Sequence, residues 1–175
     1  MQELEVKILE VNRPQVEERL AALGATKSFD GEMLAIFFDW EDGKIGQAGE
    51  VFRLRREGEN AVLTYKRPIS KEGAKIMEEY ETEINDLVQM RAILDILGLK
   101  VVKKTRKFRT QYELGDTHVL FDHYQDEMAQ IPVFLEIEAP NMERLYETVE
   151  SLGFKVSDCK SWHTGDLIRH YGLVV

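Results

Sequence analysis

Charged residues recur two positions apart along this sequence, and their types indicate the chemistry that they could perform. The acidic members of the pattern are Glu3, Glu5, Glu81, Glu83, Asp122, Glu136 and Glu138. The basic members are Lys7, Arg53, Arg55, Lys66, Lys104 and Arg106. Clustered carboxylates are typical ligands of hard divalent metals such as Mg²⁺ or Mn²⁺, and clustered arginines and lysines bind phosphate. Both types together indicate a site for a metal–polyphosphate complex.

A spacing of two is the period of a β-strand. In Glu3–Lys7, three charged residues alternate with Leu4 and Val6, so the charges share one face of a strand and the aliphatic side chains share the other. A single strand of this kind fits a sheet with one solvated face. The same alternation on nearly every predicted strand favours the wall of a charged cavity, in which opposite charges neutralise one another away from bulk water.

The strands that must position these residues can be located from the alternation and the turn residues. Extended segments are predicted at residues 2–11, 25–39, 50–57, 60–67, 76–85, 99–113, 117–125 and 133–139. Residues 57–60 and 115–116 have the composition of hairpin turns, and residues 41–49 and 68–74 that of loops. Roughly eight antiparallel strands can close into a barrel whose interior holds one small ligand.

Three similar segments place helices between these strands. Each starts with Glu-x-Glu, continues into an amphipathic pattern and stops at Leu-Gly, at Gly24, Gly98 and Gly153. A last helix is expected near residues 165–171. Because the helices need an apolar surface to cover, the charged strand faces turn away from them. A sheet closed into a barrel with its charges inward satisfies this condition, and the alternative is a sheet with a solvated outer face. We therefore expect an α+β fold, an eight-stranded antiparallel β-barrel with a charged interior and helices packed outside, as one domain over residues 1–175.

Composition and charge exclude several classes of function. With 43% hydrophobic and 31% charged residues, the 175-residue chain has the composition of a folded domain with a core. Its net charge of −9 argues against nucleic acid or an anionic membrane as a partner. The sequence has no membrane-length apolar run, no signal peptide pattern, and one cysteine, Cys159. A cytoplasmic protein, monomeric or homodimeric, is expected.

The order of the charged motifs resembles that of the CYTH superfamily, also called triphosphate tunnel metalloenzymes, over nearly the whole chain. This superfamily includes class IV adenylyl cyclases, thiamine triphosphatases and inorganic tripolyphosphatases. The motifs are Glu-x-Glu-x-Lys at 3–7, Arg-x-Arg at 53–55, Thr-x-Lys at 64–66, Glu-x-Glu at 81–83, Lys-x-Arg at 104–106, Asp122 and Glu-x-Glu at 136–138. Further segments resemble the cyclase-like branch, namely 37–39 and 161–162 with Leu167.

The resemblance implies a role for each matched residue. Phosphate oxygens should be bound by Lys7, Arg53, Arg55, Lys66, Lys104 and Arg106. One or two divalent metals, Mg²⁺ or Mn²⁺, should be bound by Glu3, Glu5, Asp122, Glu136 and Glu138. Glu81 and Glu83 match a pair in the tunnel wall. The catalytic set is Lys7, Glu3 and Glu5, with Lys7 a candidate base only if neighbouring cations lower its pKa. Arg109 has the opposite parity to Arg106, so its role stays open.

The substrate is less well defined than the phosphate and metal residues. The family often has an acidic residue where this chain has Ala35, and a glycine where it has Pro132. The leading hypothesis is a class IV adenylyl cyclase-like enzyme that converts ATP to cyclic AMP and pyrophosphate. The alternatives are a hydrolase of tripolyphosphate or thiamine triphosphate, a non-catalytic module that binds polyphosphate or nucleotide, and a scaffold whose charges pair with each other.

Overall fold

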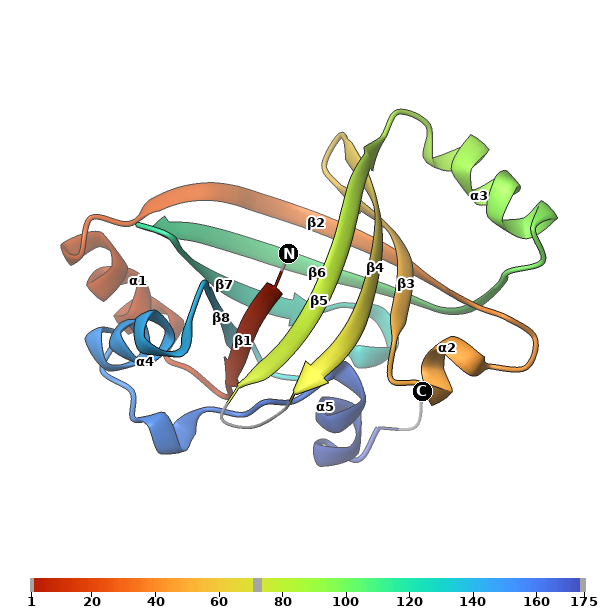
Figure 1. Cartoon of the computed structure of the whole chain (residues 1–175). Helices are drawn as coiled ribbons and strands as arrows, with labels where there is room; N and C mark the ends of the chain where they lie inside the picture. The colour runs from red at the N-terminus through yellow and green to blue at the C-terminus, as the bar shows by residue number, and fades with distance from the viewer. Residues whose placement is uncertain (1, 71–73, 174–175) are drawn as a thin grey trace.

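Eight antiparallel strands close into a barrel, in the order β1-β5-β4-β3-β2-β6-β7-β8 (Figure 1). The computed structural model describes residues 2–70 and 74–173, with side chains in the first strand from Leu4 onward. The strands are β1 (Gln2–Ile8), β2 (Thr26–Asp39), β3 (Val51–Glu57), β4 (Asn60–Ser70), β5 (Lys75–Ile84), β6 (Lys100–Leu114), β7 (Thr117–Tyr124) and β8 (Phe134–Ala139). The predicted closed barrel is confirmed.

The strand register confirms both predicted hairpin turns. Glu57 pairs with Asn60 at the tip of β3–β4, and Leu114 pairs with Thr117 at the tip of β6–β7. The loop predicted at 68–74 is wrong for its first residues, because Pro68 still pairs with Met77. A register irregularity that follows at once accommodates the proline, which cannot donate to the ladder. Residues 71–73 of that predicted loop lie outside the described residues.

The helices begin and end at the expected capping residues. The α-helices are α1 (Arg13–Ala22), α2 (Lys44–Gln47), α3 (Leu87–Ile96), α4 (Met142–Ser151) and α5 (Thr164–His170), and the short 3₁₀ helices are η1 (Asp126–Met128) and η2 (Val156–Asp158). Side chains of Asn12, Asp86 and Asn141 accept hydrogen bonds from first-turn backbone N–H groups of α1, α3 and α4. The chain leaves these three helices through Gly24, Gly98 and Gly153, all at positive φ.

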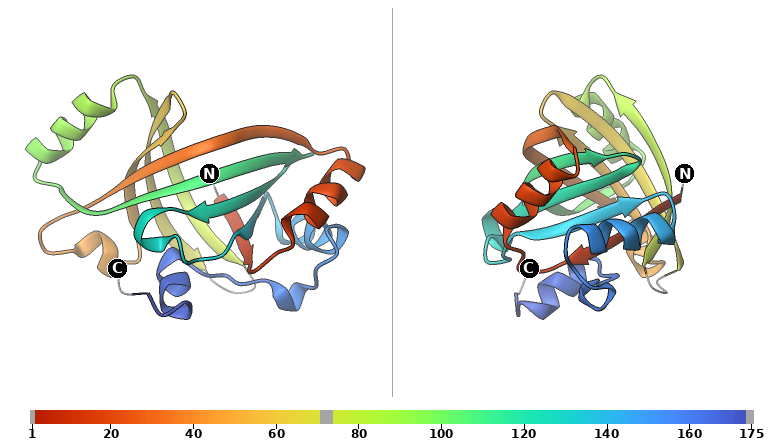
Figure 2. Two further views of the ribbon diagram at one scale, coloured as in Figure 1. Left: turned by 180° about the vertical axis from the view of Figure 1, so that it is seen from behind. Right: turned by 90° about the vertical axis from the view of Figure 1, so that its left-hand side faces the viewer.

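The largest hydrophobic core lies outside the barrel wall, beneath α1 and α4. Val6 of β1 and Ile137 of β8 are fully buried there against Leu20 of α1 and Leu145 of α4. Figure 2 shows these two helices side by side against one part of the barrel. The helices therefore cover the apolar side of the strands, and the alternating charged side chains point into the barrel.

Helix α3 covers a different part of the wall and buries less of its own surface. Leu94 packs against Leu54 and Phe38, whereas Ile96 is 85% exposed. Leu97, the last apolar residue of the amphipathic pattern before Gly98, is 60% exposed, so the apolar pattern extends further than the buried face of the helix. In the described residues, none of the helices combines the length and apolar composition that a membrane span requires.

Helix α5 lies against the end of the barrel at which β7 finishes and β8 begins. Leu167 is fully buried against Tyr124 and Phe134. The hydroxyl groups of Tyr124 and Thr164 lie within hydrogen-bond distance of each other, at 3.1 Å. This packing brings the first residues of α5 to the wall of the barrel interior.

Candidate active site

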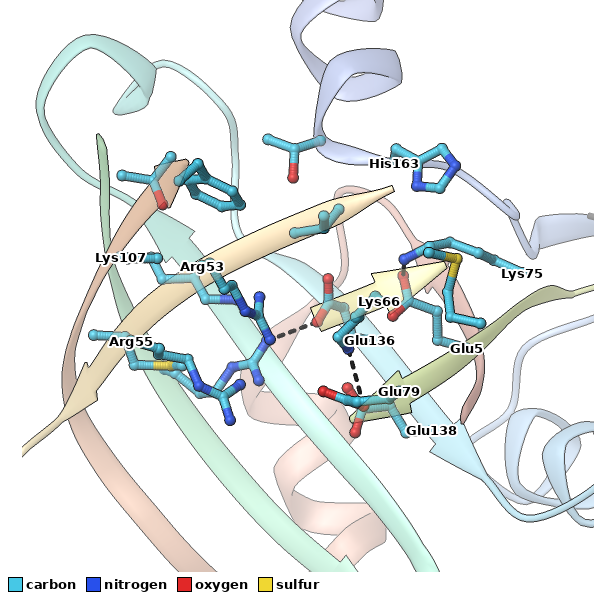
Figure 3. A pocket seen from close by; sticks show the side chains of 18 of the residues that line it. Glu5, Arg53, Arg55, Lys66, Lys75, Glu79, Lys107, Glu136, Glu138 and His163 are labelled. Carbon is cyan, nitrogen blue, oxygen red and sulfur yellow. Dashed lines mark hydrogen bonds and ion pairs between the residues drawn. The ribbon is translucent and has the colours of Figure 1, made fainter. Parts of the chain in front are cut away.

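The barrel encloses a cavity of about 570 Å³, which is the candidate active site. The charged residues on its wall are Glu5, Lys7, Glu50, Arg53, Arg55, Glu57, Lys66, Lys75, Glu79, Glu81, Lys103, Lys107, Arg109, Glu136 and Glu138. Figure 3 shows Arg53, Arg55 and Lys107 reaching in from one side, and Glu5, Glu136 and Glu138 from the other. Acids and bases thus face one another across a single enclosed space, although the chain as a whole is strongly acidic.

Most of the residues singled out from the sequence line this cavity together. They are Glu5, Lys7, Arg53, Arg55, Lys66, Glu81, Glu136 and Glu138. The side chain of Glu3 lies outside the described part of the chain. Glu83 shares the face of Glu81 but lies beyond the part of β5 that lines the cavity.

The predicted orientation of β6 is wrong by one residue. Lys104 and Arg106 are exposed on the outer face of the barrel, and the inward basic residues are Lys103, Lys107 and Arg109. The hairpin provides the reason, because its turn sets Arg109 directly opposite Asp122. Cross-strand partners share a face, so the predicted turn together with an inward Asp122 would have identified the correct side of β6.

A chain of alternating charges crosses the wall formed by β5, β1, β8, β6 and β7. The ion-pair chain consists of Lys75, Glu5, Lys7, Glu136, Arg109, Asp122 and Lys107 in this order. The Glu5 carboxylate lies 2.6 Å from the Lys75 ammonium and 2.9 Å from that of Lys7. The Glu136 carboxylate lies 2.7 Å from both Lys7 and Arg109. Each of these buried carboxylates therefore bridges two cations, which compensates much of the cost of its burial.

Asp122 occupies a different position from the expected metal ligand. Its side chain is fully buried, it does not line the cavity, and Arg109 donates to both of its oxygens at 2.7 and 2.6 Å. Lys107 also donates to it. The bidentate pair fixes the guanidinium plane of Arg109. Asp122 is therefore placed to hold two inward cations, a position that differs from the cavity-lining one expected of a metal ligand.

The same contacts remove Lys7 as a general base. Burial alone would lower its pKa, but the carboxylates of Glu136 and Glu5 outweigh that effect and hold the pKa of Lys7 above its ordinary value. The condition set for Lys7 as a base, a pKa lowered by neighbouring cations, is therefore not met. Conversely, the pKa values of Glu5 and Glu136 lie well below the usual range, because their cationic neighbours outweigh burial. Lys7 is thus a fixed positive charge.

The side of the cavity formed by β3, β4 and β5 is held together more loosely. On this arginine side, which comprises Arg53, Arg55, Lys66, Glu79 and Glu81, Arg55 lies 3.1 Å from both Glu57 and Glu81. The Glu81 side chain is 38% exposed, against 7% for Glu5 in the ion-pair chain. Lys66 is the exception, because its side chain is 8% exposed and lies 3.2 Å from Glu79. Arg55 and Glu81 can therefore exchange protein partners for ligand atoms at a lower desolvation cost.

The carboxylates on the wall have the donor chemistry of a magnesium or manganese site. Glu5, Glu136 and Glu138 present hard oxygen donors to one cavity. Among the described residues, no three acidic, histidine or cysteine side chains converge closely enough to hold a metal ion. The ion pairs account for this arrangement at Glu5 and Glu136, because cations turn these carboxylates toward themselves. The oxygen donors of Glu5, Glu136 and Glu138 fit the chemistry of a hard divalent metal.

Several residues on the wall, among them Lys75, Lys103, Lys107 and His163, were not predicted from the sequence. Lys75 lies at the edge of a predicted loop, yet it shares the face of Glu79 and Glu81, and extending the strand by one residue would have found it. Lys103 was missed because the opposite face of β6 was predicted to point into the cavity. His163 reaches the cavity from the segment before α5, and no periodicity in the sequence indicates this.

Comparison with known proteins places this geometry in a family. A protein of Methanocaldococcus jannaschii named "Putative adenylate cyclase MJ0240" is 33% identical over 141 residues, covering 79% of this chain and 77% of the relative. A Vibrio parahaemolyticus structure, also named a "putative adenylate cyclase", superimposes with a TM-score of 0.82 at 17% identity, covering 95% of this chain and 97% of the other.

A plant structure shares the same fold. HpAC1 of Hippeastrum, a "putative adenylyl cyclase" described as having a dominant triphosphatase activity, has a TM-score of 0.68 at 17% identity and covers 99% of this chain and 97% of its own. The sequence model of the CYTH domain matches residues 1–158. With the closed barrel and the charged interior, this match establishes that the chain belongs to the CYTH domain family.

Proposed function

We propose that this protein is a divalent-metal-dependent enzyme that acts on a triphosphate bound in the barrel cavity. The observation that carries the proposal is the opposition of basic residues on β3 and β6 to the glutamates of β1 and β8 within one enclosed space. Phosphoryl transfer needs positioning and charge neutralisation more than covalent help from the protein. Enzymes of the CYTH family act on triphosphates, which supports the substrate class.

The basic residues would bind and orient the triphosphate. Arg53 and Arg55 offer guanidinium groups suited to bidentate contacts with phosphate oxygens, and Lys66 and Lys107 add ammonium groups from either side of them. Arg109 is already held by Asp122 and Glu136, so it reaches the ligand with little loss of side-chain freedom. The enclosed wall also limits the water around the reacting phosphorus, which strengthens each of these contacts.

The glutamates distinguish an enzyme from a simple phosphate-binding module. Glu5, Glu136 and Glu138 would hold the metal, which when bound supplies Lewis-acid neutralisation of the phosphate charge. A site that only bound polyphosphate would favour cations without three inward carboxylates. Lys7 stays protonated between Glu5 and Glu136, so its role is to hold these carboxylates and stabilise negative charge.

The leading reaction is that of a class IV adenylyl cyclase. The ribose 3′-hydroxyl of ATP attacks the α-phosphorus, the bond between the α-phosphorus and its bridging oxygen breaks, and pyrophosphate leaves with that oxygen. The proton of the hydroxyl is taken up by the departing pyrophosphate or by water. The name of the M. jannaschii relative supports this reaction. The alternative is hydrolysis by water of tripolyphosphate or another triphosphate, which the activity described for the Hippeastrum protein favours.

A substrate panel tests the proposal. The full chain is incubated with Mg²⁺ or Mn²⁺ and separately with ATP, tripolyphosphate or thiamine triphosphate, and the products are separated by chromatography. Cyclic AMP with pyrophosphate supports the cyclase, and orthophosphate release supports a hydrolase. Tight binding of triphosphates without turnover under either metal would refute catalysis and leave a binding module.

A further inference from the structure

One strand presents an uncharged surface to the charged cavity. The inward residues of β2 that line it are Met33, Ala35 and Phe37. This strand lies between β3 and β6, which carry basic residues, and opposite β1 in the strand order. A triphosphate has no apolar part and gains nothing from such a surface, whereas ligand pockets commonly combine apolar walls with a few polar groups. The apolar strip therefore suggests that the ligand has a second, non-phosphate part.

The size of the cavity leads to the same conclusion. The ten oxygens of tripolyphosphate, at the volume a water molecule takes in the liquid, would occupy about 300 Å³. The cavity measures about 570 Å³. The remaining space is sufficient for a ring system beside the phosphates, even with some water retained around the metal.

Phe37 and Lys103 form a corner of this cavity with a distinct chemistry. They are cross-strand partners on β2 and β6, and Arg53 is the partner of Phe37 on its other side. A group attached to a phosphate held by Arg53 would therefore lie within reach of the Phe37 ring. Val51 of β3 also lines the cavity and adds apolar surface.

Lys103 differs from the other basic residues on the wall. In the part of the chain that the structure describes, Lys103 has no hydrogen bond or ion pair, and burial lowers its pKa. Its half-buried ammonium group therefore has hydrogen bonds to offer a ligand. Glu50, an acidic residue that also lines the cavity, already accepts a hydrogen bond from the Tyr65 hydroxyl at 2.5 Å.

We propose that Phe37 and Lys103 form a specificity site that holds the base of a nucleoside triphosphate, with the ring packed on Phe37 and a ring nitrogen or carbonyl accepting a hydrogen bond from Lys103. The inference rests on the proposed function and narrows its substrate class. Lys103 selects a neutral ring that carries acceptors and repels a cationic ring such as the thiazolium of thiamine triphosphate. Inorganic tripolyphosphate makes no contact with this site.

The alternative is that the strip merely supports the aliphatic stems of neighbouring arginines and lysines. The two possibilities predict different patterns of loss. A supporting role would weaken every triphosphate alike, because it acts through the phosphate-binding side chains. Loss of a specificity site weakens ligands that carry a base more than ligands that consist of phosphate alone.

The test compares three ligands on three variants of the full chain. Dissociation constants of the Mg²⁺ complexes of ATP, tripolyphosphate and thiamine triphosphate are measured by calorimetry for Lys103→Met and Phe37→Ala. The matched control is Lys104→Met, which removes the adjacent lysine from the outer face. Melting temperatures establish that each variant is folded.

Lys103→Met should weaken ATP about tenfold or more, the effect of losing a charged hydrogen bond. Phe37→Ala should weaken ATP about threefold to tenfold. Phe37→Ala should leave tripolyphosphate within about twofold of the wild type. Lys103→Met also removes one positive charge from the cavity wall, so it should weaken tripolyphosphate too, but about threefold or more less than it weakens ATP. Lys103→Met should narrow the preference for ATP over thiamine triphosphate, and Lys104→Met should change nothing. Equal losses for ATP and tripolyphosphate, or none for ATP, would overturn the specificity site alone, whereas a wild-type protein that binds no triphosphate would overturn the proposed function itself.

Discussion

The two sides of the cavity are built from the same residue types but differ in how tightly their charges hold one another. In the ion-pair chain, the side chains of Lys7, Glu5 and Arg109 are 4%, 7% and 7% exposed, and each touches two opposite charges. On the arginine side, Arg55 is 14% and Glu81 38% exposed. The same alternation of charged and apolar residues thus produces two different sides. In the ion-pair chain the protein's own charges neutralise each other, whereas on the arginine side the more exposed charges can also contact a ligand.

This difference shows how a protein with a charged interior can remain folded before its ligand binds. Buried charges cost little stability when each has an oppositely charged partner, and removing one partner leaves the others buried without compensation. The ion-pair chain meets this condition within the protein. The more exposed arginine side keeps part of its hydration, so its charged groups carry a smaller desolvation cost before phosphate binds.

The strongest way to break the comparison is to remove the centre of the ion-pair chain. Arg109→Met leaves Asp122 and Glu136 buried with one fewer cation each, so we expect the free energy of unfolding to fall by about 3–5 kcal/mol. Urea denaturation of the metal-free protein measures it. A loss below about 1 kcal/mol would mean that the ion-pair chain contributes no more than surface pairs do.

The matching change on the arginine side should act on the ligand instead. Arg55→Met should lower kcat/KM for the triphosphate by about 100-fold, because one charged contact to phosphate is worth about 1.5–3 kcal/mol. Its stability should change by less than about 1 kcal/mol, since its partners are partly solvated. Steady-state kinetics and urea denaturation on the same sample check both parts. A large loss of stability with unchanged kinetics would contradict the assigned difference between the two sides.

The sequence specified β1 better than β6, and the reason lies in how charges are distributed on each strand. In β1, Glu5 and Lys7 alternate with aliphatic residues, so only one face can be polar. In β6, Lys103, Lys104 and Arg106 place charges on both faces. Alternation alone could not show which face of β6 points into the barrel. The strand pairing across the hairpin between β6 and β7 determines it.

Other parts of the site could not be derived from local patterns at all. The approach of His163 to the cavity depends on how α5 packs against the end of the barrel. The face of Lys75 follows from the strand pattern, but its pairing with Glu5 depends on the register between β5 and β1. Both are tertiary properties. The barrel itself could be predicted from the sequence, because charged and aliphatic residues alternate on strand after strand and the helices between them carry apolar stripes.

Acid should weaken the ion-pair chain in a predictable way. The folded-state pKa values of Glu5 and Glu136 lie below the ordinary value of 4.5, so their stabilisation is complete above about pH 4.5 and is lost as the pH falls toward the folded values. Below pH 4.5 the slope should approach about 1.4 kcal/mol per pH unit for each carboxylate. Urea denaturation at pH 5, 4 and 3 should give a shallower slope for Glu136→Gln, and an unchanged slope would contradict this account.

The smallest expected effect tests the corrected orientation of β6. Arg106 lies on the outer face, 50% exposed and 3.7 Å from Asp126, so Arg106→Met should change kcat/KM by less than about twofold and stability by less than about 0.5 kcal/mol. Lys107→Met, one residue along the strand, removes an inward cation and should lower kcat/KM by about tenfold or more. Assays of the two variants side by side test which face of β6 points into the cavity, because adjacent residues on one strand differ chiefly in the face that they occupy. A greater loss from Arg106→Met than from Lys107→Met would reverse the assigned faces of β6, and the ion-pair chain would then lose its link through Asp122.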